Sequence, residues 1–132
     1  AAANEVVAEI ERKNGKAVAV KCDVAEEGDI LRLFEAADRF GTLGALVNNG
    51  GIVGKSSVRV DEMSAERIQR VMAVNVTGSI LCAREAVKRM STKHGGEGGV
   101  IVNLSSVAAK LGAPNTYVDY AASKGAIDSF TD

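Results

Sequence analysis

Short apolar segments alternate with longer helical patterns along this chain, and the alternation constrains the fold more than any other feature. The run Ala-Val-Ala-Val-Lys-Cys at 17–22 lies between two segments whose apolar residues recur at helical spacing, 2–13 and 26–40. Two further runs, at 45–48 and 100–105, are also predicted to be strands. Strands separated by helices form βαβ units, in which right-handed crossovers place helices on both faces of a parallel sheet. We therefore expect an α/β fold, part of a doubly wound parallel sheet.

Two longer helices are expected in the second half of the chain, at 64–92 and 117–132. Ser64 has the side chain of a helix N-cap, and the Asn-Gly pair at 14–15 is expected to end the first helix. The first residues are already helical, and the last helical pattern stops at the final residue without a cap. We therefore expect a partial domain with sequence missing at both ends.

Composition and charge narrow the class of protein. The net charge of −1 gives no electrostatic case for nucleic acid, and no apolar run has the length of a membrane span. Cys22 and Cys82 are expected to be small buried apolar residues rather than a disulfide, and His94 has no ligand partners nearby for a metal site. We expect a cytoplasmic protein without metal, membrane or nucleic-acid partners.

Tyr120 and Lys124 stand four residues apart in the last expected helix, a spacing that places two side chains on one face. A free tyrosine, with a pKa of about 10, is a poor proton shuttle at neutral pH. An ammonium about 4 Å from a phenolate stabilises it by on the order of 4 kcal/mol at an effective dielectric of about 20. The pair can therefore move a proton. The same spacing also fits a stacked pair on a helix surface, so the interpretation needs other residues.

Two serines follow the third predicted strand. Ser105 and Ser106 precede Tyr120 by 15 and 14 residues, a loop long enough to return over the tip of the strand. A serine hydroxyl there can donate to a carbonyl oxygen and stabilise negative charge that develops on it. The alternative is a Ser-Ser turn at the end of the strand.

Asn75 lies on the apolar stripe of the helix expected at 64–92, which should face the sheet. A buried amide must find hydrogen-bond partners or destabilise the fold. Asn75 therefore either serves a site or bonds to the backbone of its own helix. Gly78, which follows within one turn, is expected to ease a local bend.

Polar and glycine residues also follow the first two predicted strands. The segment Asn-Asn-Gly-Gly at 48–51 lets a ligand approach the backbone and can tie neighbouring strands together, or it is simply a turn. Asp23 can accept a hydrogen bond from an amino group, or it can cap the helix at 26–40. Ligands of doubly wound sheets bind beyond the carboxyl ends of the strands, so we expect a site at this edge.

Five short stretches, each weak alone, occur in one order and on the expected structural elements. Together they resemble the short-chain dehydrogenase/reductase family, above all its bacterial 3-oxoacyl-carrier-protein reductase and glucose-dehydrogenase type. The resemblance covers essentially the whole chain. It implies a single, partial NAD(P)-binding Rossmann-fold domain over 1–132. The five stretches are CDV (22–24), LVNNGG (46–51), NVTG (75–78), IVNLSS (101–106) and YAASK (120–124).

The resemblance implies a catalytic tetrad for hydride transfer between a nicotinamide cofactor and a ketone or secondary alcohol. Tyr120 is then the general acid for reduction and the general base for oxidation. Lys124 favours the ionised form of that tyrosine and holds the nicotinamide ribose. Ser106 orients the substrate carbonyl, and Asn75 holds a water that links Lys124 to solvent.

The resemblance also assigns cofactor contacts. Asp23 and Val24 meet the adenine, and Asn49 and Gly50 line the adenosine ribose, while Tyr120 and Lys124 also contact the cofactor. The cofactor is NADP or NAD, with NADP slightly favoured. The partner is a small carbonyl or alcohol substrate.

The chain departs from the family pattern in several places. Gly50 stands where the family usually has alanine, and the loop from Ser106 to Tyr120 is about one residue longer than the commonest form. Tyr117 has no lysine four residues later and is rejected as the catalytic tyrosine. The family's Gly-rich opening turn and its C-terminal substrate region are not found in these residues, so we expect weak or no cofactor binding by the 132 residues alone.

Two other functions fit the same sequence. One is a truncated, non-catalytic Rossmann-like fragment or interaction module without cofactor binding. The other is a lyase or epimerase of the same fold that uses Tyr120. The resemblance also implies a homodimer or homotetramer that assembles through the helices at 64–92 and 117–132.

Overall fold

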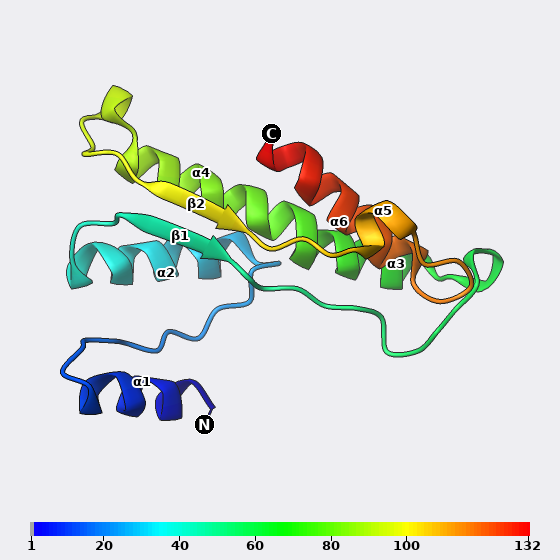
Figure 1. Ribbon diagram of the computed structural model, residues 1–132, viewed down its shortest axis with the longest axis horizontal. Helices are drawn as coiled ribbons and strands as arrows, with labels where there is room; N and C mark the ends of the chain where they lie inside the picture. The colour runs from blue at the N-terminus through cyan, green and yellow to red at the C-terminus, as the bar shows by residue number, and fades with distance from the viewer. Residues whose placement is uncertain (1) are drawn as a thin grey trace.

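The computed structural model describes residues 2–132 and contains a sheet of two parallel strands against which helices pack (Figure 1). Strand β1 (Ala45–Asn48) pairs with β2 (Val100–Asn103), with Ala45 opposite Val100 and Asn48 opposite Asn103. Both strands were predicted, although β2 ends two residues before the expected position 105. The α/β class with a parallel sheet is confirmed, as part of a doubly wound fold.

The prediction of a strand at 17–22 is wrong. Within residues 2–132 the sheet has two strands, and the segment at 17–22 forms no ladder hydrogen bonds with either of them. A strand exists only where a neighbour completes its hydrogen-bond ladder, however apolar its sequence. The end of this segment is nevertheless tied to the core, because Cys22 packs against the cluster formed by the sheet and two helices.

The first two helices, α1 (Ala2–Arg12) and α2 (Glu27–Phe40), lie where the periodicity predicted them. The predicted stop of α1 is confirmed. Asn14 adopts a left-handed φ of 63°, and the amide of Gly15 donates to the carbonyl of Ile10 at 3.0 Å. This arrangement satisfies carbonyls that the last turn of a helix leaves without partners.

The helix predicted at 64–92 is a continuous rod with a wider turn in its middle. It consists of α3 (Ala65–Met72), a π-helical turn η2 (Ala73–Thr77) and α4 (Gly78–Met90). Ser64 is the N-cap as predicted, because its hydroxyl accepts from the amide of Arg67 at 3.2 Å. Single π-turns of this kind occur often at functional sites.

Short helical turns and one long helix complete the chain. Turns η1 (Val60–Glu62) and η3 (Thr92–His94) flank the α3–α4 rod, and the short helix α5 (Ala108–Leu111) follows β2. The final helix α6 (Val118–Thr131) agrees with the predicted range 117–132 to within one residue at each end. It packs against α3, the π-turn and α5, beyond the carboxyl ends of the strands (Figure 1).

The main core lies between one face of the sheet and the helices α2 and α4. It contains Ile30 and Phe34 from α2, together with Cys82, Ala86 and Met90 from α4. Leu46 and Ile101 pack against these residues from the sheet. The side chains that alternate with these on the strands, among them Val47, Val100 and Val102, are exposed. Residues 2–132 therefore cover only one face of the sheet.

Both cysteines are free. Cys82 is buried, as predicted, and burial raises the pKa of its thiol to about 11. Cys22 is only partly buried, and its pKa is raised first by desolvation and then by the nearby carboxylate of Asp29. Neither thiol therefore has the character of a reactive thiolate at neutral pH.

Among residues 2–132, none of the helices is long and apolar enough to cross a membrane. The same residues contain no group of three or more His, Cys, Asp or Glu side chains placed to hold a metal ion.

Candidate active site

A pocket of about 470 Å³ opens where β1 and β2 end and α6 begins. Each strand continues beyond its carboxyl end into a loop, and α6 adds side chains from its first two turns. The topology thus brings three segments distant in sequence to one edge of the sheet, as expected for this class of fold. The lining residues are Asn49, Gly51, Ile52, Val53, Leu104, Ser105, Ser106, Tyr117, Tyr120 and Lys124.

Tyr120 and Lys124 share one face of α6, as their spacing predicted. The Lys124 ammonium lies 5.9 Å from the centroid of the Tyr120 ring, and it donates to the carbonyl of Leu104 at 2.9 Å. Lys124 is 6% exposed, so this hydrogen bond holds a buried cation beside the phenol. The hydroxyl of Ser105 donates to the Lys124 carbonyl at 3.2 Å and so joins the end of β2 to α6. Tyr117 packs edge-on against Tyr120, with ring centroids 5.6 Å apart.

Ser106 both fixes a turn after β2 and lines the pocket. Its hydroxyl oxygen accepts from the amide of Ala108 at 3.2 Å, which fixes the turn into α5. It also lines the pocket that contains Tyr120 and Lys124. A serine whose oxygen is held by a backbone amide is well placed to present its hydroxyl hydrogen to a bound group.

Asn75 is 1% exposed, and its side chain bonds outside its own helix. Its amide oxygen accepts from the amide of Ile52 at 2.8 Å, and its NH₂ group donates to the Ile52 carbonyl at 2.8 Å and to the Ser123 hydroxyl at 3.0 Å. The alternative that Asn75 bonds to its own helix backbone is therefore wrong. Both amide hydrogens are used in fastening the loop after β1 to α6.

Gly51 lies between the buried amide and the buried ammonium. A Cβ atom at Gly51 would lie 3.5 Å from the Lys124 ammonium nitrogen and 3.6 Å from the Asn75 amide oxygen. The backbone of the loop therefore passes directly over both groups. At Gly50, a Cβ would meet no atom within 4 Å, so the space beside this glycine is open.

Gly78 lies against the backbone of Val24. A Cβ at this position would lie 2.7 Å from the carbonyl oxygen of Val24, so the absence of a side chain lets the two backbones approach. The expected easing of a bend at Gly78 stays a prediction, and the π-turn Ala73–Thr77 directly precedes this residue. Gly78 thereby brings Val24 close to the helix that carries Asn75.

Asp23 stabilises the turn before α2 but does not cap that helix. Its carboxylate accepts from the amide of Ala25 at 3.0 Å and from Arg70 at 3.2 Å, whereas the residue at the N-cap of α2 is Glu26. The hydrogen bond from Ala25, and after it the one from Arg70, hold the pKa of the Asp23 carboxyl below its usual value. Asp23, Val24 and Gly50 do not line the pocket around Tyr120.

The amides at the strand ends tie the two strands to neighbouring helices. The Asn48 amide donates to the side chain of Asn103 at 2.9 Å and to the carbonyl of Ser79 at 3.2 Å. Asn103 in turn donates to the hydroxyl of Thr131 at 3.0 Å. The pocket is thus built on strands whose ends are fixed by side-chain hydrogen bonds as well as by their ladder.

Comparison with known proteins identifies the family. The model of the family described as short chain dehydrogenase matches residues 1–132. The chain belongs to the short-chain dehydrogenase family. Proteins similar to it include the uncharacterized oxidoreductase YgfF of Escherichia coli K12, 53% identical over 131 residues, and glucose 1-dehydrogenase 2 of Bacillus subtilis 168, 41% identical over 131 residues.

These short-chain dehydrogenases are longer than the present chain. The alignments cover 98% of this chain but 53% and 49% of the two relatives, so the chain spans about half the length of the curated relatives it matches. Among solved structures, an NAD⁺-bound xylitol dehydrogenase superposes with a TM-score of 0.88 at 31% identity, over 98% of this chain and 48% of that one. The fold is therefore that of a Rossmann-type dehydrogenase over the residues compared.

Two residues that hold Asn75 at this candidate site, Ile52 and Ser123, were not predicted from the sequence. Ile52 contributes its backbone amide and carbonyl to Asn75, and Ser123 contributes its hydroxyl to the same side chain. Ser123 is fully buried and also donates to the Tyr120 carbonyl at 2.6 Å. Its position directly before Lys124 was the available signal, whereas nothing local marks Ile52.

Proposed function

We propose that this chain carries the catalytic centre of an NAD(P)-dependent oxidoreductase that acts on a ketone or secondary alcohol. The observation that carries the proposal is the convergence of Ser106, Tyr120 and Lys124 in one pocket at the carboxyl ends of two parallel strands. Family membership and the NAD⁺-bound structural neighbour support the same class of reaction.

The proposed proton chemistry belongs to three side chains. Tyr120 donates its phenolic proton to the carbonyl oxygen during reduction and takes a proton from the alcohol during oxidation. The Ser106 hydroxyl donates to the same oxygen and stabilises the negative charge that develops there. The Lys124 ammonium, held by the Leu104 carbonyl, places a positive charge 5.9 Å from the centroid of the Tyr120 ring.

Asn75 acts in this proposal through the loop that it fastens. Its three side-chain hydrogen bonds hold Ile52 and Ser123, and so fix the floor of the pocket next to Lys124. A water that links Lys124 to solvent would then rest on an oxygen of Asn75, because both amide hydrogens are already donated. The assignment of that water to Asn75 stays a prediction from the resemblance.

The residues around the pocket fit a nicotinamide cofactor. The open space beside Gly50, the close approach of the Gly51 backbone to Lys124, and the amide of Asn49 suit a ribose with its hydroxyl groups. When bound, the nicotinamide would supply or accept the hydride. Asp23 and Val24 are the proposed adenine contacts, which places the adenine outside the pocket that holds Tyr120.

Lys124 offers a test of the proposed proton chemistry. We would place the 132 residues in a chimera, in exchange for the matching half of the Bacillus glucose 1-dehydrogenase, and follow glucose-dependent reduction of NAD⁺ and NADP⁺ by absorbance. We expect Lys124→Met to lower turnover by at least about 100-fold, the usual size of a lost acid–base contribution. The matched change Lys93→Met, at an exposed site in η3, should leave turnover unchanged. Equal turnover in the two variants would contradict the proposal.

Other features stay predictions from the resemblance. These are the slight preference for NADP over NAD, the cytoplasmic location, and the homodimer or homotetramer assembled through the α3–α4 rod and α6. The assignment of residues 1–132 to a single, partial NAD(P)-binding domain also stays a prediction.

A further inference from the structure

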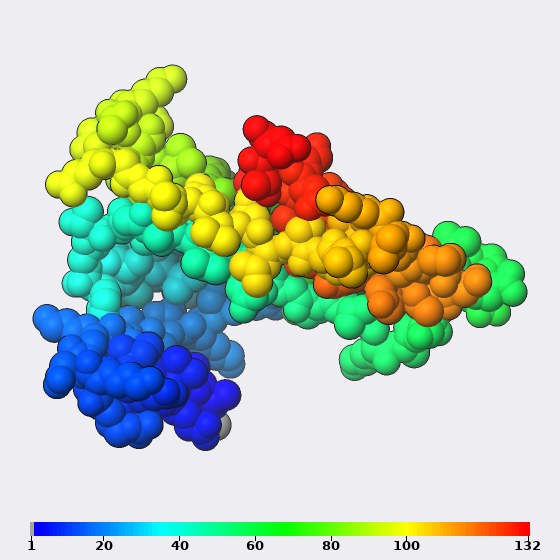
Figure 2. All heavy atoms as spheres, in the orientation of Figure 1, coloured from blue at the N-terminus to red at the C-terminus, as the bar shows by residue number. Residues whose placement is uncertain are grey.

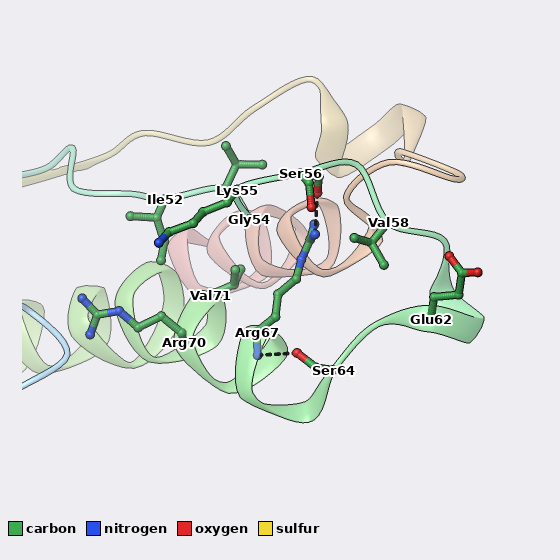
Figure 3. Close-up of a pocket in the computed structure, with 11 residues that line it drawn as sticks. Ile52, Gly54, Lys55, Ser56, Val58, Glu62, Ser64, Arg67, Arg70 and Val71 are labelled. Atoms are coloured by element: carbon green, nitrogen blue, oxygen red, sulfur yellow. Dashed lines mark hydrogen bonds between the residues drawn. The ribbon is translucent and has the colours of Figure 1, made fainter.

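An ion pair beside the proposed active site connects three segments of the chain. The guanidinium of Arg67, on α3, donates through Nε to one carboxylate oxygen of Asp119 at 3.1 Å and through Nη2 to the other at 3.4 Å. It also donates to the carbonyl of Ser56, in the loop after β1, and to the carbonyl of Thr116 at 3.4 Å. Figure 3 shows the Arg67 side chain rising from α3 to Ser56, past Gly54.

The pair is withdrawn from solvent. The side chain of Asp119 is 1% exposed and that of Arg67 is 13% exposed. A buried carboxylate that loses its cation is strongly unfavourable, so Asp119 keeps its position only while Arg67 stays in place. The other ion pairs found in residues 2–132 do not involve Asp119.

Gly54 makes room for this guanidinium. A Cβ at Gly54 would lie 2.2 Å from Cζ of Arg67, a separation that no pair of non-bonded atoms can adopt. The loop backbone therefore lies against the plane of the guanidinium. The amide of Val58 also donates to the Thr116 carbonyl at 2.9 Å, so the two loops are joined directly as well as through Arg67.

Asp119 extends the effect of the pair to the neighbouring residue. Its carboxylate accepts from the backbone amide of Tyr120 at 2.9 Å. This amide lies in the first turn of α6, where backbone amides have no partner within the helix, and the N-cap residue Tyr117 makes no side-chain cap. The carboxylate that Arg67 holds thus fixes the start of the helix at Tyr120.

We propose that Arg67 and Asp119 are positioning residues for Tyr120, and that their ion pair sets the phenol against the pocket by locking the first turn of α6 to α3 and to the loop after β1. The role rests on the proposed function, since it assumes that Tyr120 transfers the proton. Neither residue contacts the reacting atoms. Their effect is on the orientation of Tyr120, and so on turnover rather than on cofactor affinity.

The test compares a single and a double variant in the glucose dehydrogenase chimera. Arg67→Met leaves the Asp119 carboxylate buried without a cation, so this single variant can fail to fold. Arg67→Met combined with Asp119→Leu removes both charges and keeps an apolar contact, which is commonly tolerated. We expect the double variant to fold and its kcat to fall by about 100-fold, the scale of a small misplacement of a catalytic group, with an unchanged KM for the cofactor. Arg59→Met, which breaks an exposed pair with Asp61, is the matched control and should retain kcat.

A second readout on the 132-residue chain does not depend on turnover. The chain has two tyrosines and no tryptophan, so its near-ultraviolet circular dichroism band in the tyrosine region reports on Tyr117 and Tyr120. We expect the band to be lost in the double variant and kept in Arg59→Met, with the far-ultraviolet helix signal kept in both. A folded double variant with an unchanged tyrosine band and unchanged kcat would overturn the inference, and so would an equal loss in kcat and in cofactor affinity.

If Tyr120→Phe retained full turnover, the proposed function would fail, while the tyrosine band would still test the ion pair.

Discussion

The first helix, α1, leaves its apolar face uncovered, whereas the last helix, α6, buries polar side chains. α1 has an apolar face with Val6 and Ile10, yet Ala2–Arg12 includes no buried residue. α6 buries the polar side chains of Asp119, Ser123 and Lys124. Figure 2 shows the dark-blue atoms of α1 at one edge of the molecule, away from the red and orange atoms of α6 and its preceding loop.

The difference shows which kind of pattern identifies a site. An apolar stripe indicates that a segment is helical but does not say what covers it. A buried polar group is costly unless it is hydrogen-bonded, so it persists where specific partners hold it. Among residues 2–132, none of the buried side-chain nitrogen or oxygen atoms lacks a hydrogen-bond partner. The polar interior around α6 is therefore a fully bonded network, whereas α1 contributes little to the core.

The largest expected difference in stability is between two identical substitutions in these regions. Asn75→Leu leaves the Ile52 amide and the Ile52 carbonyl without their side-chain partner, and each such loss costs about 1–3 kcal/mol, while the Ser123 hydroxyl keeps only its bond to the Tyr120 carbonyl. We expect a loss of about 3 kcal/mol or more in the free energy of unfolding, measured by urea denaturation. Asn4→Leu, on the exposed surface of α1, should change it by less than about 0.5 kcal/mol. Similar losses for both would break the comparison.

A smaller effect is expected for the apolar face of α1 itself. Ile10 is 36% exposed and α1 has no fully buried residue, so Ile10→Ser removes less buried area than truncation of a core residue, and the free energy of unfolding should fall by about 1 kcal/mol or less. The same denaturation experiment measures it. A loss of about 2 kcal/mol, typical of truncating a core residue, would mean that α1 packs in solution against a surface that the described structure leaves open.

Local patterns were sufficient to predict most of the elements. Apolar spacing, the Ser64 cap and the Asn-Gly stop at 14–15 are properties of adjacent residues, and each was confirmed. The strand at 17–22 was predicted on the same local grounds and is wrong. Its pattern is that of a strand, but strand formation also depends on a partner elsewhere in the chain.

The part of the candidate site that depends on local spacing and on strand order could be predicted, and the part that depends on long-range contacts could not. Tyr120 and Lys124 share a helix face, and Ser106 follows a strand that ends beside it, so chain order and topology place these three together. The bonds from Asn75 to Ile52 and Ser123 span 23 and 48 residues, and the pair of Arg67 with Asp119 spans 52. Contacts of that range depend on tertiary packing, and no local periodicity reports them.

The measurement that tests the account most directly compares the two tyrosines of the pocket. Tyr117→Phe and Tyr120→Phe each remove one hydroxyl from neighbouring rings in the same pocket. In the glucose dehydrogenase chimera, we expect Tyr120→Phe to lower glucose-dependent cofactor reduction by about 1,000-fold while cofactor binding persists, and Tyr117→Phe to retain most of the activity. Equal turnover in the two variants would contradict the assignment of Tyr120 as the proton-transfer residue.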